Sequence, residues 1–201
     1  MRSILVLLED LVQAEFGSTE LAAVRASSSE HLRDVGRLAG APGRVMAFIE
    51  AIADVRRRPV HEVYQFVAAK LVPLVLTEYS GLLKGHTSAR SVLMQITRLA
   101  PTVLDTLIPG IPYAEFDVEL IDLETMRVRF EGPAEMLAAF EGIAMGLAKH
   151  YGERAETSRV SPPAFAPDRR MLDIKIGAER RDPRTPARPA GSSELRRKLG
   201  I

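Results

Sequence analysis

The sequence contains no cysteine among its 201 residues. Disulfides, thiolate metal sites, thiol catalysis and cysteine-ligated cofactors are therefore excluded. Tryptophan is also absent, and aromatic residues make up only 5% of the chain. Any large cofactor pocket would consequently need walls made mostly of aliphatic side chains.

The chain also lacks an excess of either charge and any long apolar run. Lys and Arg number 27 against 26 Asp and Glu, which gives no reason to expect a nucleic-acid partner. The apolar run 71–76 is far too short to cross a bilayer. Glu9 and Asp10 interrupt the N-terminal apolar run before it could serve as a signal peptide. We therefore expect a cytoplasmic globular protein without a membrane span.

Apolar side chains recur at helical spacing along the first half of the chain. They predict helices over 4–16, 18–24, 45–55, 60–75 and 92–107. The stretch 27–43 is rich in Ser, Gly and Arg and is predicted to be a loop with at most one helical turn. Pro73 is expected to kink or divide the fourth helix, and Pro101 interrupts the last one.

Beyond residue 108 the pattern changes to that of strands. Apolar and polar residues alternate over 116–120 and 128–130, on either side of turn residues, so a β-hairpin is predicted. A helix over 133–151 and two strands, 155–160 and 171–176, follow. The predicted fold class is α+β, an N-terminal helical part followed by a small, mainly antiparallel four-stranded sheet packed on one long helix.

These elements predict one domain and a tail. The domain spans 1–178, with a helical part over 1–108 and a sheet part over 109–178. The Arg- and Pro-rich segment 179–201 has no apolar periodicity through residue 193 and is predicted to be a flexible linker or tail.

Three short stretches, in this order, resemble the heme-nitric oxide/oxygen-binding (H-NOX) domains of bacterial gas sensors and of soluble guanylate cyclase. Residues 1–17 are similar to the first helix of that family, which closes on an aromatic–Gly pair. Ile108-Pro109-Gly110 followed by Phe116 resembles the family's Tyr-Pro-Gly before the first strand, and 142–151 resembles the long helix under the sheet. The resemblance covers about residues 1–176 and implies the H-NOX fold and a role in signal transduction.

The iron ligand of the family has no counterpart in this sequence. The family's iron-binding His precedes the Pro-Gly turn, which places it at or near Pro101 here. Proline offers iron no lone pair, and no residue from 88 to 108 is a His. One alternative is a heme-binding nitric oxide or oxygen sensor with a displaced ligand, for which His86 is the candidate.

The propionate-binding motif is missing as well. The family's Tyr-x-Ser-x-Arg corresponds to Phe130, Gly132 and Ala134, which cannot reproduce the charge-assisted hydrogen bonds of Arg with carboxylates. The proline that distorts the macrocycle in the family corresponds to Ala114. We therefore expect a heme-free member of the family with no other cofactor.

The remaining polar candidates predict neither a metal site nor catalysis. His31, His61 and His150 do not share metal-ligand spacing on one face. The serines of 27–29, with His31 and Asp34, lack the nucleophile elbow and oxyanion loop that nucleophilic catalysis needs. No catalytic residue and no enzyme activity are therefore predicted.

The expected function is that of a non-enzymatic sensory or regulatory domain acting through a small apolar ligand or a protein partner. The partner would be a signalling protein or output domain, with a homodimer left open. From helical phase and the resemblance, the former heme space is lined by Leu74, Met94, Val103, Leu107 and Phe140. The sequence leaves open whether this space is filled or keeps an apolar pocket. A scaffold or dimerisation module is the alternative of another class.

Overall fold

The computed structural model describes residues 3–35, 40–78, 80–81, 84–95, 116–131, 134–162, 164, 166 and 169–178. Its elements are α1 (Ile4–Phe16), α2 (Ser18–Val35), α3 (Ala41–Arg56), α4 (Val60–Glu78), β1 (Phe116–Leu120), β2 (Thr125–Glu131), α6 (Ala134–His150), β3 (Glu153–Val160) and β4 (Arg169–Ala178). Residues 89–95 are also helical. None of the helices in this described part combines the length and apolar character that a membrane crossing requires.

The first helix follows the predicted pattern closely. The apolar spacing of α1 buries Leu7, Leu8 and Leu11 on one face. The helix ends at Gly17, whose φ of 92° is accessible to glycine without the steric cost that a Cβ would add. Helix α3 ends in a similar left-handed residue, Arg57, with a φ of 51°.

The loop prediction is wrong for 27–35 and 41–43, and residues 36–39 lie outside the described residues. Helix α2 continues to Val35, and α3 already begins at Ala41. The serine-rich turns are held by tertiary contacts, since Leu21, Val24 and Ser28 are buried. His31 Nε2 also lies 2.8 Å from Asp54 Oδ2 of α3. Packing on α3 therefore overrides the weak helix propensity of serine.

Pro73 was predicted to kink the fourth helix or to divide it. Division is wrong. Helix α4 runs from Val60 to Glu78 with Pro73 inside it. Because proline has no amide hydrogen, the Ala69 carbonyl loses its usual helical donor at residue 73. Thr77 Oγ1 donates to the Pro73 carbonyl oxygen at 2.8 Å in the turn that follows.

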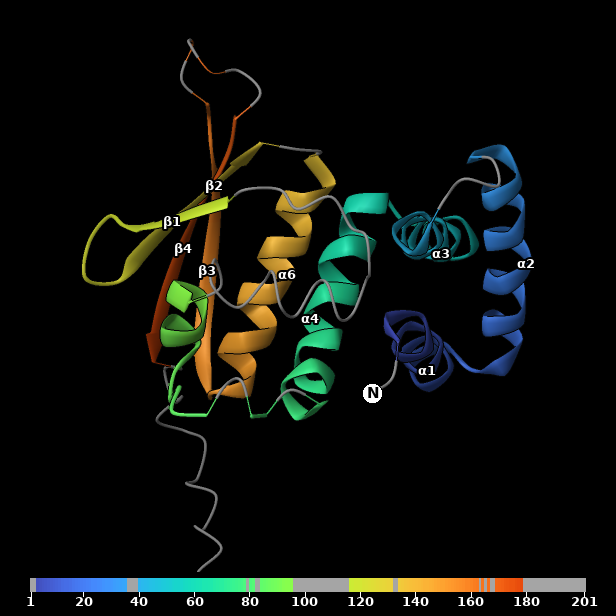
Figure 1. Cartoon of the computed structure of the whole chain (residues 1–201), viewed down its shortest axis with the longest axis horizontal. Helices are drawn as coiled ribbons and strands as arrows, with labels where there is room; N and C mark the ends of the chain where they lie inside the picture. The colour runs from blue at the N-terminus through green and yellow to red at the C-terminus, as the bar shows by residue number, and fades with distance from the viewer. Residues whose placement is uncertain are drawn as a thin grey trace, which may run out of the picture.

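The predicted hairpin and the two later strands form one antiparallel sheet in the order β1-β2-β4-β3. Its inner face buries Met126, Val128 and Phe130 from β2 and Leu172 and Ile174 from β4. This face packs on α6, and α4 lies beside α6 on the side away from the sheet (Figure 1). The predicted α+β architecture, with a four-stranded sheet on a long helix, is confirmed.

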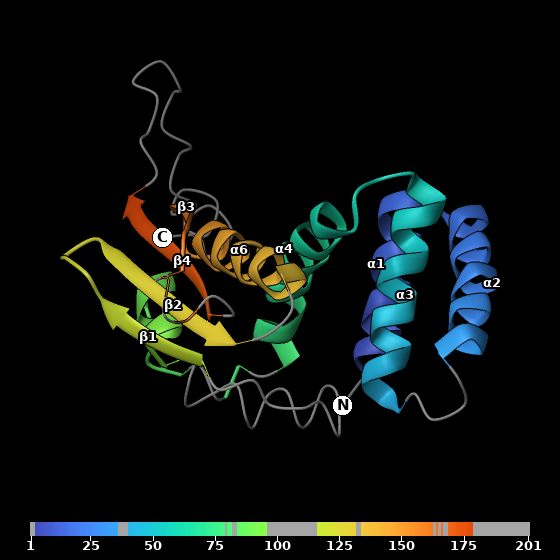
Figure 2. The same ribbon diagram turned by 90° about the horizontal axis from the view of Figure 1, so that it is seen from above.

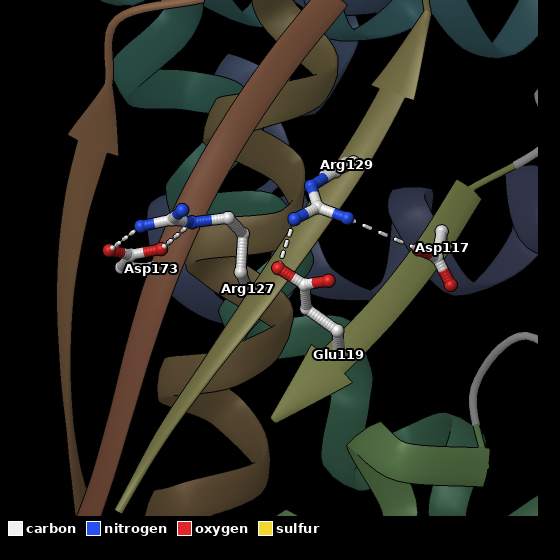
Figure 3. A network of polar contacts seen from close by, with 5 residues as sticks. All are labelled: Asp117, Glu119, Arg127, Arg129 and Asp173. Carbon is white, nitrogen blue, oxygen red and sulfur yellow. Dashed lines mark hydrogen bonds and ion pairs between the residues drawn. The ribbon is translucent and has the colours of Figure 1, made fainter. Parts of the chain in front are cut away.

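The outer face of the sheet carries a ladder of ion pairs (Figure 3). Arg127 on β2 donates to both carboxylate oxygens of Asp173 on β4, at 2.6 and 2.8 Å. These hydrogen bonds raise the pKa of Arg127 above its ordinary value. Arg129 binds Glu119 of β1 and lies 3.6 Å from Asp117. This charged face contrasts with the apolar inner face and explains the alternation in the sequence.

Two hydrophobic cores result, and α4 contributes to both. The helical core comprises buried side chains of α1, α2, α3 and the first half of α4, including Val63 and Val67. The sheet core comprises those of the sheet, α6, residues 89–93 and the second half of α4, including Val72 and Leu76. Figure 2 shows the α1–α3 group and the sheet on opposite sides of the α4–α6 pair. The segment 179–201 lies outside the described residues, so its predicted tail character is untested.

Candidate functional site at the junction of the two cores

The tightest junction between helices lies between α4 and α6. A Cβ on Gly146 of α6 would come within 2.6 Å of the Ala69 carbonyl oxygen and 2.9 Å of Val72 Cβ. A Cβ on Gly142, one turn earlier, would clash with the Gln65 carbonyl oxygen and Ala68 Cβ. The two glycines therefore let the α6 backbone lie directly against α4.

Gly146 also explains how α4 tolerates its proline. The Gly146 Cα hydrogen that a Cβ would replace points at the Ala69 carbonyl, the group that Pro73 deprives of its donor. A weak Cα–H···O contact is the interaction that such a geometry allows. The α4–α6 junction thus offers a weak donor to the carbonyl that the proline leaves without its helical partner.

Phe130 is the one position of the expected propionate motif whose side chain the structure describes. It is 2% exposed, and its ring centroid lies 5.4 Å from that of Phe140 on α6. The neighbouring Glu131 is exposed and lies 3.9 Å from Arg169. A buried phenyl ring paired with another offers no donor to a carboxylate. The described residues at this position therefore do not fit a heme held in the family's way.

The other motif positions are largely outside the described residues. Pro101, Ala114 and Gly132 are not described, and Ala134 opens α6 without a described side chain. Their assignment as degenerate heme positions stays a prediction.

The predicted pocket residues divide between the two cores. Leu74 is partly buried against the helical core, whereas Met94 is partly buried against the sheet core. Phe140 is buried in the sheet core, 5% exposed. Val103 and Leu107 lie outside the described residues. The pocket itself therefore stays a prediction.

The helix that follows His86 is held near the end of β4 opposite to the one that pairs with Phe130. His86 is half-buried and precedes the 89–95 helix, whose Ala89 amide donates to Glu153 Oε2 at 2.8 Å. Ser88 Oγ accepts a hydrogen bond from the Ser91 amide at 3.1 Å and caps the same helix. Glu153 pairs with Ala178 at one end of β4, whereas Phe130 pairs with Arg170 near the other. Eight strand residues separate these ends, which is about 26 Å.

One polar contact between α6 and the sheet was missed by the sequence analysis. Glu141 of α6 is 7% exposed and accepts two hydrogen bonds from Arg159 of β3, at 2.8 and 3.1 Å. These bonds raise the pKa of Arg159. The available signal was a lone carboxylate on the apolar face of 137–148.

Tyr64 on α4 lies between α3 and α6, near the carboxylates of both helices. Burial raises the pKa of its phenol to about 12, and the carboxylates of Glu50 on α3 and Glu135 on α6 add to this effect. A phenol of this kind stays neutral at physiological pH, so it can act only as a hydrogen-bonding or packing group there.

The remaining sequence candidates form neither a metal nor a catalytic site in the described part of the chain. His31, predicted in a loop, lies in α2 and contacts Asp54. The Ser29 hydroxyl donates to the Arg25 carbonyl within the same helix. His61 is exposed in the first turn of α4, and His150 ends α6 against Tyr151. No described group of three His, Cys, Asp or Glu residues could hold a metal ion.

This chain shares a family signature and a fold with known proteins. The profile of the Haem-NO-binding family matches residues 3–159. An H-NOX protein from S. oneidensis in the Fe(II)NO ligation state has a TM-score of 0.69 at 18% identity, covering 86% of this chain and 97% of that one. The unliganded Fe(II) H-NOX protein from K. algicida has a TM-score of 0.68 at 14% identity, covering 89% and 97%. No curated protein matches the chain.

The structural likeness confirms the predicted H-NOX-like fold. The family match extends from α1 into β3 and so includes the helical core and the α4–α6 junction, but not β4. It confirms the family that the short motifs indicated. The chain belongs to the Haem-NO-binding (H-NOX) family, whose members are sensory domains.

Proposed function

We propose that this chain is a heme-free sensory domain that regulates a signalling partner without catalysing a reaction. The observation that carries the proposal is the buried Phe130–Phe140 pair, with centroids 5.4 Å apart, at the position where a propionate-binding tyrosine is expected. An aromatic pair of this kind stabilises the sheet core. This position therefore serves packing rather than carboxylate recognition.

The position of His86 in the chain supports the proposal that the domain is heme-free. A heme bound through His86 would be ligated near Glu153, the first residue of β3, whose partner on β4 lies about 26 Å along that strand from the partner of Phe130. Such a heme would need an entirely different set of propionate donors. We therefore place the heme-binding alternative second.

The shared helix α4 suggests how a signal would pass between the halves. A ligand shifts a conformational equilibrium only when it binds the two states with different affinity. Because α4 packs in both cores, any change in its angle to α6 alters the helical core and the sheet core together. We propose that a small apolar ligand near Leu74 and Met94, or a protein partner, biases this angle.

The proposal also concerns the setting of the domain. The output would be a signalling protein or a linked output domain, with a homodimer as one form of that partner. The absence of cysteine suits the reducing cytoplasm, where we place the domain.

The visible absorption spectrum tests the heme-free proposal. We expect protein expressed with ample heme to show no Soret band in stoichiometric amount and no response to nitric oxide. A near-stoichiometric band that shifts with nitric oxide would overturn the proposal. If His86→Ala then removed that band while His61→Ala kept it, the displaced-ligand alternative would be established.

Native mass spectrometry separates the two routes of regulation. A co-purified apolar adduct that is lost on denaturation would support a ligand at the junction. An adduct-free mass, together with a crystal structure without an internal void, would leave a domain that signals through its surfaces alone.

A further inference from the structure

The tip of the β1–β2 hairpin exposes an unusual run of apolar side chains. We define the hairpin tip as residues 120–124. Leu120, Ile121 and Leu123 are 50%, 44% and 86% exposed, and they account for half of the exposed large apolar side chains among the described residues. Single exposed apolar residues are ordinary, but a contiguous group is typical of a binding surface.

The tip backbone is held in place by hydrogen bonds from three directions. Asp122 Oδ1 accepts from the amides of Glu124 and Thr125, both at 2.7 Å. The Arg90 guanidinium donates to the Leu123 carbonyl, and the Ile176 amide donates to the Glu124 carbonyl at 3.2 Å. A rigid apolar tip binds with little loss of conformational entropy.

The tip carries the carboxylates of Asp122 and Glu124 and, beside them, the cations of Lys175 and Arg90. Glu119 is paired with Arg129, and Glu124 lies 2.9 Å from Lys175 Nζ. No salt bridge of the described residues involves Asp122, and hydrogen bonds from the Glu124 and Thr125 amides lower its pKa. The apolar side chains therefore surround a carboxylate that stays ionised at neutral pH.

The chain leaves the sheet beside this tip. Lys175 of β4 is opposite Thr125, the first residue of β2, and the Ile176 amide donates to the Glu124 carbonyl before β4 ends at Ala178. Residues 194–201 follow in the sequence after fifteen further residues and read Glu-Leu-Arg-Arg-Lys-Leu-Gly-Ile. Leu195 and Leu199 are four residues apart, with Arg196, Arg197 and Lys198 between them. Fifteen residues can span about 50 Å when extended, so they can easily turn back to the tip.

We propose that residues 194–201 dock on the hairpin tip of the same chain, with Leu195 and Leu199 against Leu123 and its neighbours and the basic side chains beside Asp122. The segment competes with an external partner for the tip and so regulates access to it.

The test uses the absence of cysteine. Ser193→Cys in the full chain provides a single attachment point for a nitroxide spin label. We expect the label to broaden the amide signals of residues 120–124 in a ¹H–¹⁵N spectrum. Leu123→Asp or Leu199→Asp should abolish this broadening, and high salt should weaken it. Met46→Asp is the matched control, because Met46 is 47% exposed but lies on α3, away from the hairpin.

The other outcomes overturn the proposal. They are absence of broadening at the tip, broadening that survives Leu123→Asp, or equal loss in the Met46→Asp control. A mixture of ¹⁵N-labelled protein without spin label and unlabelled protein with it distinguishes copies. Broadening as strong in that mixture would assign the segment to the tip of a second molecule and remove the intramolecular contact.

Discussion

Asp122 is the residue that fixes the geometry of the hairpin tip. Its carboxylate accepts hydrogen bonds from the amides of Glu124 and Thr125, which lower its pKa from the ordinary value. A group with a lowered pKa in the folded state stabilises that state above its unfolded pKa, about 3.9 for Asp. The contribution is lost as the pH falls through the folded value. The turn should therefore stay closed at pH 5 and loosen only in strong acid.

Amide chemical shifts follow this loosening directly. We expect the Glu124 and Thr125 amides to titrate together with a midpoint below about 3.9, the ordinary Asp value. Asp122→Asn is the control, because its amide oxygen can still accept both bonds but does not titrate in this range. It should keep the neutral-pH shifts and lose the acid transition. A midpoint at or above the ordinary value would contradict the role of these bonds.

Pro101 tests how much of heme binding depends on one ligand. Pro101→His should restore at most weak, sub-stoichiometric heme, because the propionate contacts are also missing. The lost Arg–carboxylate hydrogen bonds are worth roughly 1.5–3 kcal/mol each. Titration with hemin, followed by the Soret band, measures the affinity. Tight binding by this single variant would show that residues 130–134 have been misinterpreted.

The Glu141–Arg159 pair is a tertiary contact that the sequence pattern does not predict. A helical pattern over 134–150 predicts that Glu141 lies near the sheet, but not that Arg159 of β3 would reach it. That pairing depends on the position of α6 across β3, which follows from side-chain packing rather than from any local pattern. Phe130 differs, since strict alternation along β2 placed it on the buried face from sequence alone.

Among the elements, α2 is the instructive failure of the sequence analysis. Ser27, Ser28 and Ser29 favour caps and turns in isolation. In the folded chain Ser28 is 7% exposed against α3, and Arg25 binds Glu9 of α1 at 2.6 Å through Nη2. Helices α1, α3 and α6 were predictable because their apolar periodicity is long and regular, and β1 and β2 because apolar and polar residues alternate along them. Helix α2 required neighbours that its own sequence does not reveal.

The α4–α6 junction gives the prediction at this scale. Gly146→Ala places a Cβ 2.6 Å from the Ala69 carbonyl oxygen, a backbone atom that cannot move without shifting α4. Overpacking costs about 1–3 kcal/mol, and a contact with backbone belongs to the upper part of that range, above the roughly 1 kcal/mol by which Ala favours a helix over Gly. The free energy of unfolding, measured in urea, should therefore fall.

Gly177→Ala is the matched control in the same half of the molecule. A Cβ there would meet nothing within 4 Å, so its unfolding free energy should be unchanged or slightly higher. Equal stability of the Gly146→Ala variant and the wild type would mean that α4 and α6 can separate freely. The junction would then be a soft hinge rather than a close contact.

For the whole molecule, the order of elements was predictable while the division of its core was not. Helices, a hairpin, a long helix and two strands in that order sufficed for the fold class and the family. The sequence did not reveal that Val67 and Val72, on one helix, belong to different cores. That distinction depends on which neighbours surround each turn of α4, and it underlies the proposed transmission between halves.

A shared helix also predicts that the two cores unfold as one. Leu7 is fully buried in the helical core, and Leu7→Ala should cost about 2–5 kcal/mol. Because losing the helical core frees the first half of α4, the sheet core should lose its support in the same transition. Hydrogen exchange of the Leu172 and Ile174 amides on β4, under conditions where exchange reports unfolding free energy, measures this at a distance. The unfolding free energy from their exchange should fall by the same amount as the unfolding free energy measured from the helical signal in circular dichroism.

Leu123→Ala, at an 86% exposed position, is the control and should leave both free energies within about 0.5 kcal/mol of the wild type. Unchanged protection of β4 in Leu7→Ala, or two separate transitions, would mean that α4 does not couple the halves, and the proposed route of signalling would have to pass elsewhere.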